Sequence, residues 1–538
     1  MLRTETTAPT TIDAVNPATG EHLGTVPIMD AARVRAAVER SRVAQRSWAR
    51  TSFAQRRAVL RSILELTLER HEAICELSLR DSGKTMVDAA LGEVFPVLEK
   101  LRYLIAHGER DLRPERRRSG ILAQKGARVE FHPLGVVGVI CPWNFPFHNL
   151  LCPAIPALFA GNGVVAKVSE HTSWSAEPYL QVMRDALSMN GHDPQLVQVV
   201  TGYGATGSAL VTSGADKIFF TGSPRTGRKV MEAASAGPTD VVLELGGKDP
   251  MIVCDDADLG HAVEQAMLGV YTACGQMCVG VERIYVMDSV YDEFVRRVHT
   301  KTSALRQGAP GGEQVVDCGA MTMPRQLEII QSLVDDAVAK GAKVLLGGGP
   351  NAAPLGGAKA GKAGQFYAPT ILTNVDHSMR IIHEEQFGPV MVIVRVGDEA
   401  EAIRLANDSE YGLGSSVFTK SAKRADRIAS QLKTGMTVIN DYGIAYMIQS
   451  LPFGGVGISG VGRINGREGL RACCNTKAVV TDRFALGKGV SVYPIQASTY
   501  ELVKEISTLV YTPGLRKKLQ SGARAAKLFA KEAVSRRR

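Results

Sequence analysis

The spacing of apolar residues separates a helical N-terminal part of the chain from a longer part in which strands and helices alternate. Residues 30–108 follow the helical period, with Asp30 placed to cap the first helix and Gly83 placed to end a later one. One face of the second predicted helix carries Leu60, Ile63, Leu64 and Leu68.

From about residue 129, short runs rich in Val and Ile alternate with helical stretches. The predicted strands are Val136–Cys141, Val164–Val168, Leu196–Val200, Lys217–Phe220, Val241–Leu245, Met251–Cys254, Arg283–Met287, Lys343–Leu346, Val390–Val396, Ser415–Thr419 and Met436–Asn440. Because these runs are apolar on both sides, they fit a parallel sheet that is covered on both faces. The pattern therefore predicts an open α/β fold.

The Arg-rich segment Leu112–Arg128 interrupts two α/β regions. It could form a β-hairpin that projects from the body, or a solvated loop. The pattern alone favours the loop.

The length of 538 residues exceeds what one hydrophobic core supports, so two or three domains are expected. The net charge of +9 is concentrated at the C-terminus, where residues 515–538 contain nine Lys or Arg and one Glu. The rest of the chain is close to neutral, so the basic charge describes the tail and not the body.

The nine cysteines show no zinc-binding spacing, which indicates a reducing compartment and no bound metal. The first twenty residues lack the apolar core of a signal peptide, and no apolar run approaches the roughly 18 residues of a spanning helix. We therefore expect a cytoplasmic body.

The strongest candidate site combines Glu244-Leu245-Gly246-Gly247-Lys248 with Cys278, which lies in a Gly-flanked loop. The two glycines predict a tight turn that leaves the carboxylate open to a cleft at the end of a strand. An accessible thiol adds readily to a carbonyl, and a nearby carboxylate can act as general base. For either motif alone, the alternative is a buried Glu or a structural Cys.

Two further segments carry polar groups beside predicted strands. In Pro142-Trp143-Asn144-Phe145-Pro146, two prolines fix the backbone around a carboxamide that can donate to a developing oxyanion. The segment His383–Pro389 precedes the strand Val390–Val396 and could bring a carboxylate and a ring to a ligand. The structural alternatives are a rigid turn and a charged approach to a strand.

In order and spacing, these four segments together resemble the aldehyde dehydrogenase superfamily over about residues 12–480. A fifth block, Pro452–Gly455 with Ser459–Arg463, adds to the resemblance. The C-terminal third looks most like a branch that contains plant and fungal membrane-associated members. The resemblance implies a Rossmann-type NAD-binding domain (1–112 and 131–244), an α/β catalytic domain (245–472), a small oligomerisation sheet (113–130 and 473–485) and a basic tail (486–538).

The resemblance assigns the Arg-rich segment to a hairpin, against the loop favoured by the pattern, and implies a homodimer or homotetramer. It also implies NAD-dependent oxidation of an aldehyde to a carboxylic acid. Cys278 would form a thiohemiacetal whose oxyanion is held by the Asn144 carboxamide and by the backbone N–H of Cys278. Glu244 would activate the water that hydrolyses the thioester, whereas relatives that use coenzyme A generally lack this base.

Two glycine patterns compete for the cofactor pyrophosphate. Gly202–Gly207 matches GxGxxG, but no clear acidic residue follows about 20 residues on. Phe220–Gly227 should open a helix whose free N–H groups attract phosphate, and the family uses this second block. The cofactor residues implied by the resemblance are Trp143, Lys167, Glu170, Gly222, Ser223, Gly227, Glu385 and Phe387. A carboxylate at Glu170 would repel a 2′-phosphate, so NAD⁺ is favoured over NADP⁺.

The substrate pocket is less well specified. Relatives that oxidise succinate semialdehyde often carry an Arg where this chain has Pro153. The residues that suggest a mainly apolar mouth, and an aliphatic or aromatic aldehyde, are Phe147, Asn149, Cys152 and Phe453. Cys274 is interpreted either as an inert thiol or as a redox partner of Cys278.

The basic tail has near-helical spacing at Leu515, Leu519, Ala523 and Ala526. It is either a solvated, poorly ordered end or a basic amphipathic helix on an anionic membrane surface. Only one aromatic residue, Phe529, lies among its charges, so nucleic-acid binding is not expected. A catalytically idle scaffold is the alternative from another class, and the intact candidate site argues against it.

Overall fold

The computed structural model describes residues 9–312, 314–356, 364–484, 493 and 495–535. The chain divides into two compact units, a larger one (1–112 and 132–475) and a smaller one (113–131 and 476–538). Of the predicted tail 486–538, residues 486–492, 494 and 536–538 lie outside the described residues.

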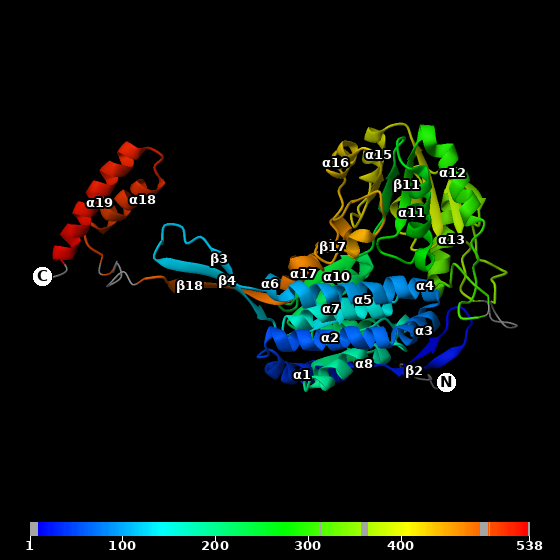
Figure 1. Ribbon diagram of the computed structural model, residues 1–538, viewed down its shortest axis with the longest axis horizontal. Helices are drawn as coiled ribbons and strands as arrows, with labels where there is room; N and C mark the ends of the chain where they lie inside the picture. The colour runs from blue at the N-terminus through cyan, green and yellow to red at the C-terminus, as the bar shows by residue number, and fades with distance from the viewer. Residues whose placement is uncertain (1–8, 313, 357–363, 485–492, 494, 536–538) are drawn as a thin grey trace, which may run out of the picture. The chain divides into compact units, whose positions relative to one another are not determined.

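The larger unit begins with a strand pair and a series of helices (Figure 1). These elements are β1 (Thr11–Val15), β2 (His22–Pro27), α1 (Ala31–Trp48), α2 (Phe53–Glu69), α3 (His71–Ser82), α4 (Met86–Ala89), the π-helix η1 (Ala90–Val94), α5 (Phe95–Tyr103), the π-helix η2 (Leu104–Gly108) and α6 (Glu109–Asp111). The predicted helix ends are confirmed: the Asp30 side chain caps α1, and Gly83 ends α3 in the left-handed conformation, with φ 78°.

The predicted apolar face of α2 is partly wrong. Leu60 and Ile63 are fully buried, but Leu68 is exposed. From Ile63 the helical period leads to Thr67 and not to Leu68, and the buried Thr67 hydroxyl donates to the Ile63 carbonyl. The core-facing stripe therefore ends on a polar residue whose hydrogen bond is satisfied within the helix.

A six-stranded sheet confirms the predicted parallel arrangement. In spatial order its strands are β17 (Gly460–Val461), β9 (Asp240–Leu245), β8 (Lys217–Gly222), β5 (Val136–Ile140), β6 (Gly163–Lys167) and β7 (Val197–Val200). Only β17 is antiparallel to its neighbour within this sheet as described. The helices that contact the sheet are α1, α7 (Pro146–Phe159), α8 (Ala176–Met189), α9 (Gly204–Val211) and α10 (Pro224–Ala234).

A second sheet has seven strands. In spatial order they are β12 (Lys343–Leu346), β13 (Thr370–Thr373), β14 (Val390–Val396), β11 (Val281–Met287), β10 (Asp249–Val253), β15 (Ser416–Phe418) and β16 (Val438–Ile439). The sequence missed β13, and β12 pairs with it in antiparallel fashion. The neighbouring helices (Figure 1) are α11 (Leu259–Tyr271), α12 (Asp288–Thr302), α13 (Pro324–Ala339), α14 (Arg380–His383), α15 (Glu399–Ala406) and α16 (Ala422–Ala429). The helix α17 (Gly466–Ala472) contacts α6 and α7 instead.

The Arg-rich segment of the smaller unit is not a loop. Its strands β3 (Glu115–Arg117) and β4 (Lys125–Pro133) pair antiparallel, and β18 (Cys474–Asp482) pairs with the other edge of β4. The charge of an arginine is neutralised by a carboxylate two residues away on the same strand, as in the ion pairs Arg117–Glu115 and Arg128–Glu130. This local compensation lets a strongly charged segment form strands, which the hydrophobic pattern could not show.

The tail forms a pair of packed helices, α18 (Thr499–Tyr511) and α19 (Leu515–Ser535). The buried Glu532 carboxylate accepts from the hydroxyls of Ser498, at 3.1 Å, and Thr499, at 2.8 Å. The predicted apolar stripe of α19 is exposed, including Leu515 and Leu519. Among the described residues, none of the helices has the length and apolar content needed to cross a membrane.

Candidate functional site

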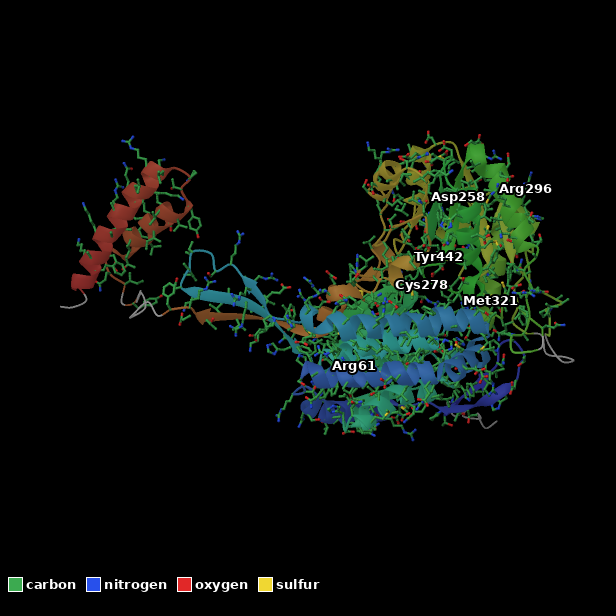
Figure 2. The ribbon with its side chains drawn as sticks, in the orientation of Figure 1. Arg61, Asp258, Cys278, Arg296, Met321 and Tyr442 are labelled. Carbon is green, nitrogen blue, oxygen red and sulfur yellow. The ribbon has the colours of Figure 1, made fainter. Side chains whose placement is uncertain are left out.

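Three side chains predicted from the sequence line one cavity of about 330 Å³ in the larger unit: Asn144, Glu244 and Cys278. Asn144 lies in the turn after β5, Glu244 is the penultimate residue of β9, and Cys278 follows the 3₁₀ turn η5 (Thr272–Gly275). Figure 2 labels Cys278 together with Tyr442, another residue that lines this cavity.

The loop before Cys278 is strained. Ala273 and Cys274 have left-handed φ values of 50° and 55°, and Gly275 has a φ of 71°. Such values cost a non-glycine residue about 1–3 kcal/mol and persist only where the surroundings hold them. The carboxylate of Asp88 supplies part of that support by accepting from the Ala273 N–H at 3.0 Å.

The Glu244 carboxyl and the Cys278 thiol lie close enough to change each other's pKa. Burial raises the pKa of the Glu244 carboxyl to about 7. Burial and the charge of Glu244 raise the pKa of the Cys278 thiol well above its usual value. Glu244 Oε1 is buried and has no hydrogen-bond partner among the described residues. The pair therefore presents a thiol beside a carboxyl group that can gain or lose a proton near neutral pH.

The Asn144 carboxamide is held at both ends. Its Nδ2 donates to the carbonyl oxygen of Gln276 at 3.0 Å, and its Oδ1 accepts from Asn149 Nδ2 at 3.1 Å. The Asn149 bond sets the orientation of the amide, so the NH₂ group faces the backbone that leads to Cys278. This is the orientation that donation to an oxygen beside the sulfur needs.

The predicted cofactor residues of the six-stranded sheet follow its parallel strands at one edge. Ile140 of β5 lies opposite Lys167 of β6, and Thr221 of β8 lies opposite Glu244 of β9. The carboxyl ends of these four strands therefore share one edge, where open α/β sheets bind their ligands.

The turn after β8 opens a helix. Ser223 is the N-cap of α10, and its hydroxyl accepts from the Thr226 N–H at 3.4 Å. A Cβ at Gly227 would lie 2.7 Å from the Leu245 side chain, so this glycine lets α10 pack closely against β9. The free N–H groups at this helix start fit a pyrophosphate.

Lys167 and Glu170 are paired, with Nζ and Oε2 3.5 Å apart. Burial lowers the pKa of the Lys167 ammonium despite the neighbouring carboxylate. An adjacent donor and acceptor at this edge fit the two hydroxyls of a ribose.

The competing GxGxxG segment follows β7, which is the edge strand of the sheet. A Cβ at Gly202 would lie 2.1 Å from the Thr206 hydroxyl, which itself donates to the Met29 carbonyl at 2.8 Å. Gly202 thus serves a tight turn that joins the sheet to the N-terminal segment.

Glu385 lies against the two glycines that follow β9. Its Oε1 accepts from the Gly247 N–H at 3.0 Å, and a Cβ at Gly246 would lie 2.2 Å from its Oε2. A side chain at position 246 would therefore have to displace this carboxylate. Phe387, with φ 48°, meets the Trp143 ring edge to face at 5.5 Å between centroids.

Glu282, which sequence reasoning missed, organises this turn. Its buried carboxylate accepts from the backbone N–H groups of Gln386 and Phe387, both at 3.0 Å. It also pairs with Lys248 at 2.7 Å. The last residue of the Glu244–Lys248 motif is thereby tied to the segment that carries Glu385.

Comparison with known sequences decides the family. A sequence model of the aldehyde dehydrogenase family matches residues 4–479. The chain belongs to the aldehyde dehydrogenase family. It is 38% identical over 509 residues to a putative aldehyde dehydrogenase-like protein of Schizosaccharomyces pombe, covering 93% of this chain and 96% of that protein. It is 38% identical over 518 residues to the 4,4′-diapolycopene aldehyde oxidase of Methylomonas sp., covering 96% and 94%.

A solved structure supports the same fold class. Betaine aldehyde dehydrogenase of Staphylococcus aureus in complex with NAD⁺ has a TM-score of 0.80 to this structure and 31% sequence identity. The match covers 89% of this chain and 94% of that chain. The fold is therefore that of an aldehyde dehydrogenase, with two α/β parts and parallel sheets.

The wall of the cavity in this family member is mainly apolar. Asn149, Cys152, Pro153 and Phe453 line it, and no Lys or Arg is found among the described lining residues. Phe147 does not line it, against the prediction. This residue faces the opposite side of α7, fully buried against the Tyr179 ring at 5.1 Å between centroids.

Two lining residues that sequence reasoning missed form a half-buried pair. His148 Nε2 is hydrogen-bonded to the Tyr446 hydroxyl, and burial lowers the pKa of His148 to about 3. The imidazole is therefore neutral. The Tyr446 ring meets Phe453 edge to face at 4.6 Å between centroids, which fixes one wall of the cavity.

A buried ion pair supports the turn that holds Asn144. Lys84 Nζ lies 2.9 Å from Glu93 Oε1 and donates to the Asn144 carbonyl oxygen at 2.7 Å. Glu93 Oε2 accepts from the His148 N–H at 3.0 Å. In the sequence each residue reads as an ordinary charge near a helix, so no local signal could have found the pair.

The Cys274 thiol donates to the Gly319 carbonyl at 3.1 Å and interacts with the neighbouring Cys318 thiol. Both cysteines are buried, and Cys274 is not among the residues that line the cavity. The geometry favours the inert interpretation, while a redox role stays a prediction.

Proposed function

We propose that this protein oxidises an aldehyde to a carboxylic acid with NAD⁺, with Cys278 as the nucleophile. The observation that carries the proposal is that Cys278, Glu244 and Asn144 line a single cavity. Thr221, which precedes the glycine turn at the ligand-binding edge, lines the same cavity. A substrate carbon at Cys278 would therefore lie beside the dinucleotide edge.

The reaction begins when the Cys278 thiol gives its proton to Glu244 and the sulfur adds to the aldehyde carbon. The oxygen that becomes negative accepts hydrogen bonds from Asn144 Nδ2 and from the backbone N–H of Cys278. Bound NAD⁺ supplies the hydride acceptor, so that collapse of the thiohemiacetal leaves a thioester on Cys278. Glu244 first releases the thiol proton to solvent and then takes a proton from water, which attacks the thioester and releases the acid and the thiolate of Cys278.

Eight residues would hold the cofactor. Gly222, Ser223 and Gly227 form the turn and helix start for the pyrophosphate. Lys167 and Glu170 bind the adenosine ribose, and this carboxylate favours NAD⁺ over NADP⁺. The nicotinamide end is placed by Trp143, Glu385 and Phe387. Residues 1–112 and 131–244 would thus serve the cofactor, and residues 245–472 would supply the nucleophile.

The smaller unit would join the subunits of an oligomer and hold the protein at a membrane surface. The strands within 113–130 and 473–485 would form the contact of a homodimer or homotetramer. The body would be cytoplasmic, and α18 and α19 would bind an anionic membrane surface through basic and exposed apolar side chains. Tyr500, Tyr511 and Phe529 are exposed together with Leu515 and Leu519.

The test is a panel of aldehydes with NAD⁺, in which NADH formation is followed for wild type, Cys278→Ala and the matched control Cys274→Ala. We expect turnover by wild type and by the control, and essentially none by Cys278→Ala. Turnover by Cys278→Ala at the wild-type rate would refute the nucleophile. A strict requirement for coenzyme A would show that water is not the acyl acceptor.

A further inference from the structure

Large aliphatic side chains surround the mouth of the cavity and are exposed to solvent. Leu91 of η1, Leu268 of α11 and Ile444 of the 3₁₀ turn η6 (Ile444–Tyr446) line the cavity, and each is between 40% and 52% exposed. The three come from separate parts of the chain, so the fold gathers them at one opening.

The apolar surface continues beyond the opening. Val87 and Phe95 flank Leu91 at about one helical turn on either side, and Ile448 follows Ile444 by four residues. All three are exposed. We call the six residues Val87, Leu91, Phe95, Leu268, Ile444 and Ile448 the apolar collar.

The cavity wall is apolar from the collar towards Cys278. Its inner lining includes Pro96, Met447 and Ile464, and its polar groups include Gln265 and Asp441. The wall offers no cation to an acidic substrate among the described lining residues. Scattered apolar side chains on a surface are ordinary, but a patch continuous with a ligand cavity marks a binding surface.

We propose that the substrates are aldehydes with a long apolar chain, alkyl or isoprenoid, whose distal part lies on the apolar collar while the carbonyl reaches Cys278. This rests on the proposed function and names the substrate class of the same site. A short aldehyde fills only the cavity, and a longer chain emerges between Leu91, Leu268 and Ile444. The occupant of the collar is thus the substrate, because the collar is continuous with the cavity wall.

The proposal predicts how rate depends on chain length. Burying a methylene group contributes ~0.8 kcal/mol, so each methylene removed from water should raise kcat/KM about fourfold. Because the collar extends the apolar path, kcat/KM should keep rising for chains longer than the cavity and level off once the collar is covered.

The test measures kcat/KM with NAD⁺ for straight-chain aldehydes from propanal to hexadecanal. The proteins are wild type, Leu268→Glu, Phe95→Glu and the matched control Val338→Glu, which changes an exposed Val of α13 that does not line the cavity. We expect kcat/KM to rise with chain length in wild type and in the control. In the two collar variants, the ratio of kcat/KM for tetradecanal to that for propanal should fall about tenfold.

Three outcomes would overturn the proposal. They are a flat chain-length profile in wild type, an equal loss for short and long aldehydes in the collar variants, and a change of oligomeric state in the collar variants without a change of selectivity. The last would show that a second copy of the chain covers the collar.

If wild type oxidises no aldehyde, the proposed function fails instead. Binding of tetradecanol, followed by protein fluorescence in wild type and Leu268→Glu, then tests the collar separately, and equal affinity would exclude it.

Discussion

The Lys84 ammonium lies 2.7 Å from the backbone carbonyl oxygen of Asn144. The same ammonium is paired with Glu93, and both charges are almost completely shielded from water. The carboxamide proposed to bind the oxyanion is thus positioned by an ion pair on a different element. A change that breaks this ion pair should therefore lower turnover by displacing Asn144.

We expect Lys84→Met to lose about 3–5 kcal/mol of unfolding free energy, because the change leaves the Glu93 carboxylate buried without its partner. Turnover should fall as well, with little change in the Kd for NAD⁺. Urea unfolding and steady-state kinetics measure both. Lys340→Met, which breaks the more exposed Lys340–Asp336 pair, should change stability by no more than about 1 kcal/mol. Equal losses in the two variants would contradict a special role for the buried pair.

The acidity of Glu244 predicts a pH dependence. Burial raises the pKa of this carboxyl to about 7, so the carboxylate that acts as base accumulates only as the pH rises through that value. Turnover should therefore increase from about pH 6 to about pH 8 and then level off. Glu244→Gln should be slower by about 10²–10⁴ and should lack this increase. A Glu244→Gln variant that keeps the wild-type pH profile would exclude Glu244 as the base.

Cofactor preference should depend on Glu170. Glu170→Gln replaces this carboxylate by a neutral amide and removes its repulsion of a 2′-phosphate. Two like charges about 4 Å apart repel by ~1 kcal/mol or more. The ratio of kcat/KM for NADP⁺ to that for NAD⁺ should rise at least about fivefold. Glu177→Gln, at an exposed carboxylate paired with Arg184, is the control and should leave the ratio as it is. Native enzyme that prefers NADP⁺ would overturn the assignment.

The tail helices should bind anionic vesicles. Leu519 and Phe529 are exposed on α19 among basic residues, so wild type should pellet with phosphatidylglycerol vesicles and not with phosphatidylcholine vesicles. Leu519→Glu with Phe529→Glu should abolish pelleting while aldehyde oxidation continues. Val338→Glu is again the control. Equal pelleting with both lipids, or no effect of the double change, would remove the membrane from the proposal.

The sequence predicted the sheets well where strands are buried on both sides. Val136–Ile140 and Gly163–Lys167 are buried along their whole length, and short β-branched runs of this kind are typical of strands covered on both faces. The short strand Thr370–Thr373 was missed because two of its four residues are Thr, which gives no apolar run.

The candidate site was predictable only in part. Asn144, Glu244 and Cys278 stood out because each lies beside Gly or Pro residues that mark a turn. Glu282 and Lys84 were missed because their roles depend on contacts with Lys248 and Asn144, which lie 34 and 60 residues away along the chain. The sequence also attributed Gly246 and Gly247 to the turn alone, while the structure adds the Glu385 carboxylate that lies against them.

The cavity wall without lysine or arginine also bears on how each turnover ends. Oxidation converts a neutral aldehyde into an anion, and the described wall offers that anion no counter-charge, only the acidic neighbours Glu244 and Asp441. Expulsion of the product then follows from the chemistry itself, without a lid that must open. An acid should therefore inhibit the enzyme much more weakly than an aldehyde of the same length binds, which product-inhibition kinetics would show.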